Sequence, residues 1–125
     1  MPGLWSKLVS MAEEELQRTQ QRLPPALCSP ASNLPVIFEE QPDSDLQQGG
    51  IASDTLGLFV GEAHHDVGMS TQPSANSIHL FLRNIWEEAD QDATRYREEV
   101  RKTYLHELGH YLGLDEDELE GRGLQ

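Results

Sequence analysis

The segment from His106 to His110, with the sequence HELGH, is the strongest candidate for a chemically active site in the sequence. Its residue types and their spacing are those of a metal-binding helix. In a helix, residues four apart lie about 40° from each other on one face, one turn apart. Two imidazoles placed in this way reach a single zinc ion. Glu107 projects beside the pair, where it is expected to take a proton from the attacking water as a general base. The spacing therefore predicts a site for metal-dependent hydrolysis.

Two histidines do not complete a catalytic zinc site, which usually has three protein ligands and a water molecule. Gly113 lets the chain turn back after the predicted helix, and an acidic run follows directly. Glu116 lies six residues after His110 and is the expected third ligand, with Asp115 as the alternative. A solvated acidic run with no role at the metal is also compatible with this sequence.

The remaining histidines and the single cysteine carry weaker signals. His64 and His65 are adjacent in a predicted loop, so their side chains diverge and are not expected to share a metal. They are expected either to be plain loop residues or to contact substrate and the oxyanion. His79 alternates with apolar residues, and we interpret it as a structural histidine. Cys28 has no partner for a disulfide or a Cys-rich zinc site, so an ordinary thiol is expected.

The zinc-binding pair needs a long helix, which the sequence predicts from near Asp92 to about Leu112. Acidic residues at its start favour a helix N-terminus, and Gly113 accepts the left-handed conformation that follows many helices. An apolar stripe on the face opposite the histidines would pack against the core. Its members are Ala93, Val100, Tyr104, Leu108, Tyr111 and Leu112.

The other segments alternate between apolar runs and breakers. An amphipathic helix is predicted from Trp5 to Leu23, before Pro24. Strands are predicted at 34–39, 56–62 and 78–82, a loop at 24–34, a mobile polar connection at 41–55, a loop at 64–77 and a short helix at 115–119. We therefore predict one α+β domain over residues 1–125, with a small sheet.

Composition excludes several classes of function. The 125 residues include 22 Asp and Glu against 9 Lys and Arg, for a formal net charge of -13. Binding to nucleic acid or to anionic membranes needs dense positive charge, so neither partner is expected. No apolar run has the character of a secretory signal or the length of a membrane span, which favours a cytoplasmic protein. We expect a monomer or a weak oligomer.

The segment HELGHYLGLDE resembles the zincin signature, and its extension past Gly113 resembles the metzincin pattern, with Glu116 in the final ligand position. The strand-like segments LGLFVGEA and SIHLFLRNI precede it. This order resembles the bacterial minimal zincin family, small metallopeptidases that were formerly a domain of unknown function. The resemblance implies a small mixed sheet packed on the active-site helix, an acidic third zinc ligand and little of a second subdomain.

The leading hypothesis is a zinc metallopeptidase that hydrolyses peptide bonds by a metal-activated water, with one ion held by His106, His110 and Glu116. Since one carboxylate replaces an imidazole, the affinity for zinc is expected to be modest. By analogy with zincins, a peptide or protein substrate is expected to extend along residues 56–62. The alternative is a non-catalytic metal-binding or protein-interaction module on the same scaffold. Hydrolysis of RNA is a third hypothesis, which Glu107 and the net charge disfavour.

Overall fold

The computed structural model describes residues 3–61 and 76–113, which form helices around a three-stranded sheet in an α+β fold. The helices are α1 (Leu4–Gln21), α2 (Pro25–Ser32), α3 (Ser44–Gln48), α4 (Leu82–Glu88) and α5 (Ala93–Leu112). The strands are β1 (Val36–Glu39), β2 (Gly57–Val60) and β3 (Ser77–Phe81). The predicted fold class, the N-terminal helix and the small mixed sheet are confirmed.

The sheet has the strand order β1-β3-β2, so β3 is central. β1 runs parallel to β3, with Val36 opposite Ile78, and β2 runs antiparallel to it, with Phe59 opposite Ile78. The side chains of Ile78 and Leu80 are fully buried, as alternation on a half-buried strand requires. The strand predicted at 56–62 therefore lies at an edge of the described sheet.

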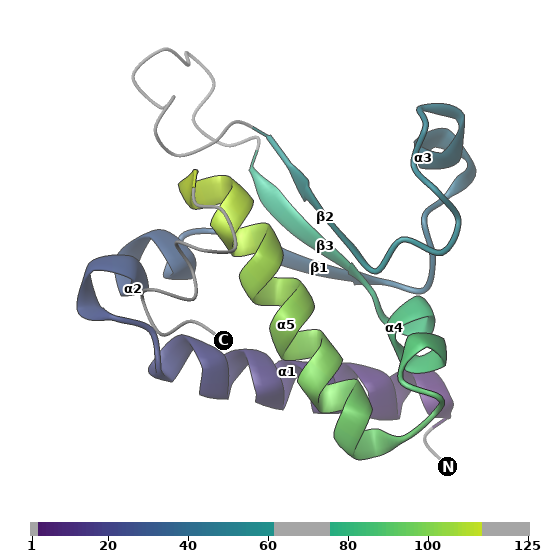
Figure 1. Ribbon diagram of the computed structural model, residues 1–125, viewed down its shortest axis with the longest axis horizontal. Helices are drawn as coiled ribbons and strands as arrows, with labels where there is room; N and C mark the ends of the chain where they lie inside the picture. The colour runs from purple at the N-terminus through teal and green to yellow at the C-terminus, as the bar shows by residue number, and fades with distance from the viewer. Residues whose placement is uncertain (1–2, 62–75, 114–125) are drawn as a thin grey trace.

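α5 contacts both the sheet and α1, so it joins the sheet to the N-terminal helix. In Figure 1, α5 crosses in front of the sheet and of α1, which runs along the bottom of the view. The core combines buried apolar residues from the helices and the sheet, chiefly Leu8, Ala12, Leu16, Ile78, Leu80, Ile85, Val100, Tyr104 and Leu108. None of the described helices has the length and apolar character of a membrane span.

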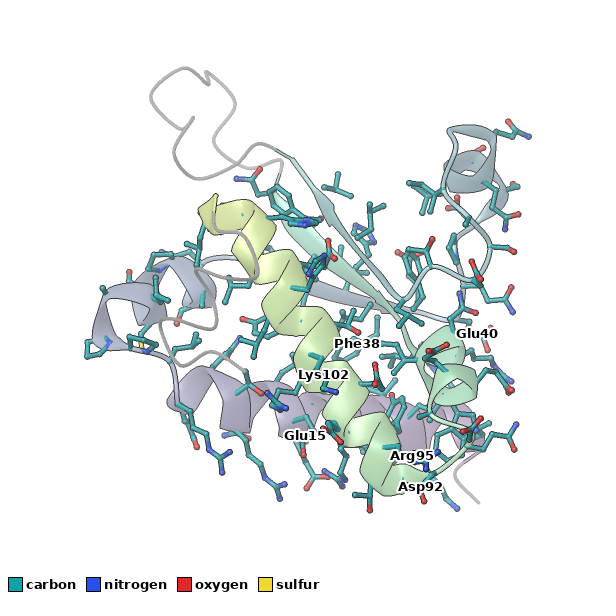
Figure 2. The ribbon with its side chains drawn as sticks, in the orientation of Figure 1. Glu15, Phe38, Glu40, Asp92, Arg95 and Lys102 are labelled. Carbon is teal, nitrogen blue, oxygen red and sulfur yellow. The ribbon has the colours of Figure 1, made fainter. Side chains whose placement is uncertain are left out.

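Both ends of α5 are capped, close to the positions where the sequence predicts that the helix begins and ends. Asp92 and Arg95 lie together at the start of α5 (Figure 2). The Asp92 carboxylate accepts a hydrogen bond from the backbone N–H of Arg95 at 2.9 Å, which satisfies one of the free donors of the first turn. Gly113 has a φ of 72° and donates its N–H to the last turn. Val100, Tyr104, Leu108 and Tyr111 are buried as predicted, whereas Ala93 is exposed at the start of the helix.

The prediction of a loop at 24–34 is wrong, because α2 occupies most of this segment. Pro25 is in the first turn, where a missing N–H costs no hydrogen bond. Leu27 and Ala31 are buried in the core, and α2 contacts α1. A helix of this length is marginal alone, so tertiary packing stabilises it in spite of Pro30.

Two further helices were not predicted. Leu82 was expected to continue the last strand, but it begins α4, where Leu82 and Ile85 are buried on one face. α3 lies within the predicted connection at 41–55, and Asp43 caps it by accepting the N–H of Leu46 at 2.9 Å. Helices this short contain too few residues to show a helical period.

Candidate metal centre

His106 and His110 lie side by side on one face of α5, as their spacing predicts. Their ring centroids are 4.5 Å apart with an interplanar angle of 63°. Their side chains are 45% and 52% exposed, while the opposite face of the helix is buried in the core. Both imidazoles are therefore partly exposed to solvent on the helix face opposite the core.

Glu107 lies between the histidines and the edge strand β2. Its side chain is 9% exposed, and Oε1 accepts a hydrogen bond from the backbone N–H of Phe59 at 2.9 Å. The same oxygen lies 3.4 Å from Nδ1 of His110, and Oε2 lies 4.0 Å from Nε2 of His106. A strand amide and two imidazoles therefore surround a largely buried carboxylate.

Gly57 allows β2 to approach α5 this closely. A Cβ atom at Gly57 would lie 2.5 Å from Cγ2 of Thr103 and 3.4 Å from Cγ of Glu107. Two residues further along β2, the ring of Phe59 packs on Tyr111 with centroids 5.6 Å apart. These contacts fix the distance between the strand amide and the carboxylate.

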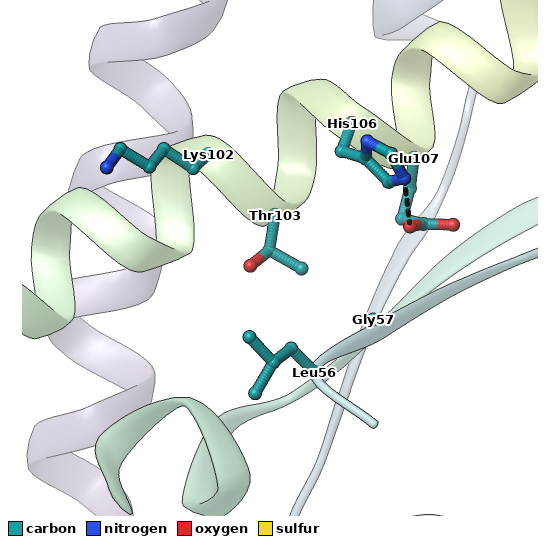
Figure 3. Close-up of a pocket in the computed structure, with 6 residues that line it drawn as sticks. All are labelled: Leu56, Gly57, Lys102, Thr103, His106 and Glu107. Atoms are coloured by element: carbon teal, nitrogen blue, oxygen red, sulfur yellow. Dashed lines mark ion pairs between the residues drawn. The ribbon is translucent and has the colours of Figure 1, made fainter. Parts of the chain in front are cut away.

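A hollow of about 380 Å³ adjoins His106 and opens to solvent. It is lined by Leu56, Gly57, Lys102, Thr103, His106 and Glu107. Figure 3 shows Thr103 projecting from α5 towards Leu56, with His106 and Glu107 beside it. A ligand in this hollow would lie between the edge of β2 and the histidine-bearing face of α5.

The donor set fits a zinc ion. His106, Glu107 and His110 each offer one ligand atom, and these atoms lie within 4.8 Å of one another. Two imidazole nitrogens and a carboxylate oxygen are ligands that zinc accepts. The Glu107 carboxylate, which accepts the backbone N–H of Phe59, lies beside the two histidines.

The structure brings together His106, Glu107 and His110 of the predicted site. The expected third ligand Glu116 and its alternative Asp115 lie outside the described residues. The same holds for His64 and His65, the candidates for oxyanion contact. The short helix predicted at 115–119 also falls outside the described residues.

His79 has the partners expected of a structural histidine. Nε2 lies 3.1 Å from Oγ of Ser77, and Nδ1 contacts the carboxylate of Glu39 on the neighbouring strand. Both ring nitrogens are thus engaged within the sheet. Cys28 is a free, half-buried thiol in α2 whose sulfur lies 3.5 Å from the carbonyl oxygen of Leu23.

Sequence reasoning missed three groups at this centre: Gly57, Thr103 and the backbone amide of Phe59. A glycine inside a predicted strand is a signal of close backbone approach. The close approach at Gly57 could therefore have been predicted from the sequence. Thr103 and the Phe59 amide carry no such signal, because their roles arise from contacts between residues 46 and 48 positions apart, Gly57 with Thr103 and Phe59 with Glu107.

A comparison with sequence models of protein families gives a match. The sequence model of a family described as zincin-like metallopeptidase matches residues 31–124. The matched span includes all three described strands and the whole of α5. No curated protein matches the chain.

Proposed function

The chain belongs to the zincin-like metallopeptidase family, and we propose that it is a zinc-dependent peptidase with Glu107 as its general base. The observation that carries the proposal is the cluster of His106, Glu107 and His110, whose ligand atoms lie within 4.8 Å of one another. Exposed imidazoles beside a buried, strand-anchored carboxylate are suited to hydrolysis at a metal.

His106 and His110 would hold the ion, and Glu116 or Asp115 would supply the third protein ligand. Zinc, when bound, supplies a Lewis acid that polarises a carbonyl group and favours deprotonation of water. Glu107 accepts the proton of the attacking water on a carboxylate oxygen. It then donates this proton to the amine that leaves when the peptide bond breaks.

The substrate would lie extended along the free edge of β2. The backbone groups of an edge strand pair with an added strand and give affinity without strong dependence on sequence. The hollow beside Thr103 would receive a side chain of this peptide. His64 and His65, which follow the strand in sequence, are the residues that we propose for contact with the oxyanion.

The test combines metal analysis with one conservative variant. The untagged protein is expected to carry about one zinc per chain by elemental mass spectrometry, and His106→Ala with His110→Ala is expected to lose it. Glu107→Gln is expected to keep the zinc and to lower the turnover of a peptide library at least about 100-fold, since a general base contributes about 10²–10⁴.

Unchanged turnover in Glu107→Gln would refute the role of Glu107. Zinc binding without any peptide hydrolysis by the parent protein would instead favour the non-catalytic binding module. Failure to bind zinc at neutral pH would refute the metal site itself.

A further inference from the structure

The backbone groups of β2 divide between its partner strand and its free edge. In an antiparallel pair, residues that exchange two hydrogen bonds alternate with residues that exchange none. The N–H of Phe81 donates to the carbonyl of Leu56 at 2.9 Å, and the register places Leu58 opposite His79. Leu56 and Leu58 therefore face β3, and the backbone groups of Gly57 and Phe59 point to the free edge.

Glu107 already occupies one of these edge groups. Its Oε1 accepts the Phe59 N–H at 2.9 Å, although an added strand would use the same donor. The Glu107 side chain is 9% exposed, so water stabilises its carboxylate only weakly. The hydrogen bond from the Phe59 amide therefore contributes more to this carboxylate than it would in solvent. In this arrangement the proposed general base blocks the edge along which the proposed substrate binds.

We infer that peptide binding along β2 and the release of Glu107 are one exchange, in which a substrate carbonyl replaces Glu107 as acceptor of the Phe59 N–H. This inference rests on the proposed function, because it places the base and the substrate edge in the same reaction. An N–H has one proton, so the two acceptors compete for it. While it accepts the Phe59 N–H, Oε1 of Glu107 already lies 3.4 Å from Nδ1 of His110, so the imidazole is a second group that the released carboxylate can contact.

The exchange selects a class of substrate. A ligand must present a backbone carbonyl to Phe59 and further backbone groups to Gly57 to offset the lost bond to Glu107. An extended peptide of several residues does so. A small ester or a single amide has no second contact with the edge and leaves Glu107 on the strand. The Phe59 amide is thus a positioning group that links the base to strand-like substrates.

Hydrogen exchange in the zinc-free protein tests the contact itself. In Glu107→Ala the Phe59 N–H is expected to exchange about tenfold faster or more, because a charge-assisted hydrogen bond is lost. Glu107→Gln keeps an acceptor oxygen and should accelerate exchange less. The Leu58 N–H, which faces β3, should exchange equally in all three proteins and controls for opening of the sheet. Equal Phe59 rates in the parent and Glu107→Ala would overturn the inference.

Binding of a strand-forming probe tests the competition. The blocked peptide acetyl-Thr-Val-Thr-Val-Thr-amide is titrated into the zinc-free protein and followed by the NMR resonance of the Phe59 amide. Glu107→Ala should bind it several-fold more tightly than the parent, since the competing acceptor is gone. Glu98→Ala, which removes an exposed carboxylate from the same helix, should bind it as the parent does.

Equal affinity in the parent and Glu107→Ala would overturn the inference, and so would a Phe59 resonance that responds in neither protein. Both measurements are made without zinc. Loss of zinc binding or of hydrolysis would therefore refute the proposed function and leave these results unchanged, so the two failures are distinguishable.

Discussion

At the scale of single residues, the centre depends on the absence of one side chain. Gly57 lets β2 lie close enough to α5 for the Phe59 amide to reach Glu107. Its φ is not in the left-handed region, so the need for glycine is steric. A methyl group there has to displace Thr103 or move the strand away from the carboxylate.

Gly57→Ala is therefore expected to lower the free energy of unfolding by about 1–2 kcal/mol. Overpacking costs about 1–3 kcal/mol, which exceeds the roughly 0.5–1 kcal/mol that replacing glycine by alanine gains in a strand. Denaturant unfolding followed by circular dichroism measures the change.

Thr103→Ser removes the methyl group that a Cβ at Gly57 would meet 2.5 Å away. Combined with Gly57→Ala, it should restore at least about 0.5 kcal/mol relative to additivity. Simple additivity of the two changes would contradict a steric role for Gly57.

At the scale of elements, α5 positions the histidines because both of its ends are fixed. The Asp92 carboxylate caps the first turn, and Gly113 ends the last one. Between them, Tyr96, Val100, Tyr104 and Leu108 anchor one face in the core. The histidines occupy the opposite face near the C-terminus, where they remain accessible.

Asp92→Ala is expected to destabilise the protein by about 1 kcal/mol, because the N-cap hydrogen bond to the Arg95 amide is lost. For a domain of this size, the melting temperature should fall by about 4 °C. Glu98→Ala removes an exposed ion pair on the same helix and should change stability by less than about 0.5 kcal/mol. Equal effects of the two variants would refute the capping role.

At the scale of the whole molecule, two buried tyrosines on α5 join it to α1. The hydroxyl of Tyr96 donates to the carbonyl of Leu8 at 2.8 Å, and the hydroxyl of Tyr104 accepts from the side-chain amide of Gln20 at 3.2 Å. Burial raises the pKa of both phenols above the ordinary value of 10.0. The neutral phenols are thus part of the link between the helices.

This link predicts a loss of stability in alkali. Below about pH 10 both tyrosines are protonated in the folded and the unfolded chain, so their contribution is complete. As the pH rises further, the unfolded chain loses these protons first, and the free energy of unfolding falls by up to about 1.4 kcal/mol per pH unit for each group.

Tyr96→Phe should cost about 1 kcal/mol at pH 8, because the hydrogen bond to Leu8 is lost. Above pH 10, stability of this variant should fall less steeply than in the parent. Thermal unfolding between pH 8 and pH 12 measures both slopes. Parallel slopes would show that Tyr96 does not contribute to the alkaline transition.

The sequence alone determined the features that depend on neighbours in the chain. The four-residue spacing of His106 and His110 required a helix for the two rings to meet. Asp92 and Gly113 set the ends of that helix. The motif within it also carried the resemblance that the family match confirms. Each of these features follows from local periodicity and capping, so no long-range contact was needed to predict it.

Tertiary structure decided what lies around the histidines. The strand amide that holds Glu107 belongs to a residue 48 positions earlier in the chain, and no local pattern specifies this pairing. α2 and α4 form because their buried aliphatic residues, Leu27 and Ala31 in α2 and Leu82 and Ile85 in α4, pack on other elements and outweigh weak local preference. Packing between distant segments is a property of the folded chain, and it places a carboxylate held by a strand amide beside the two histidines of α5.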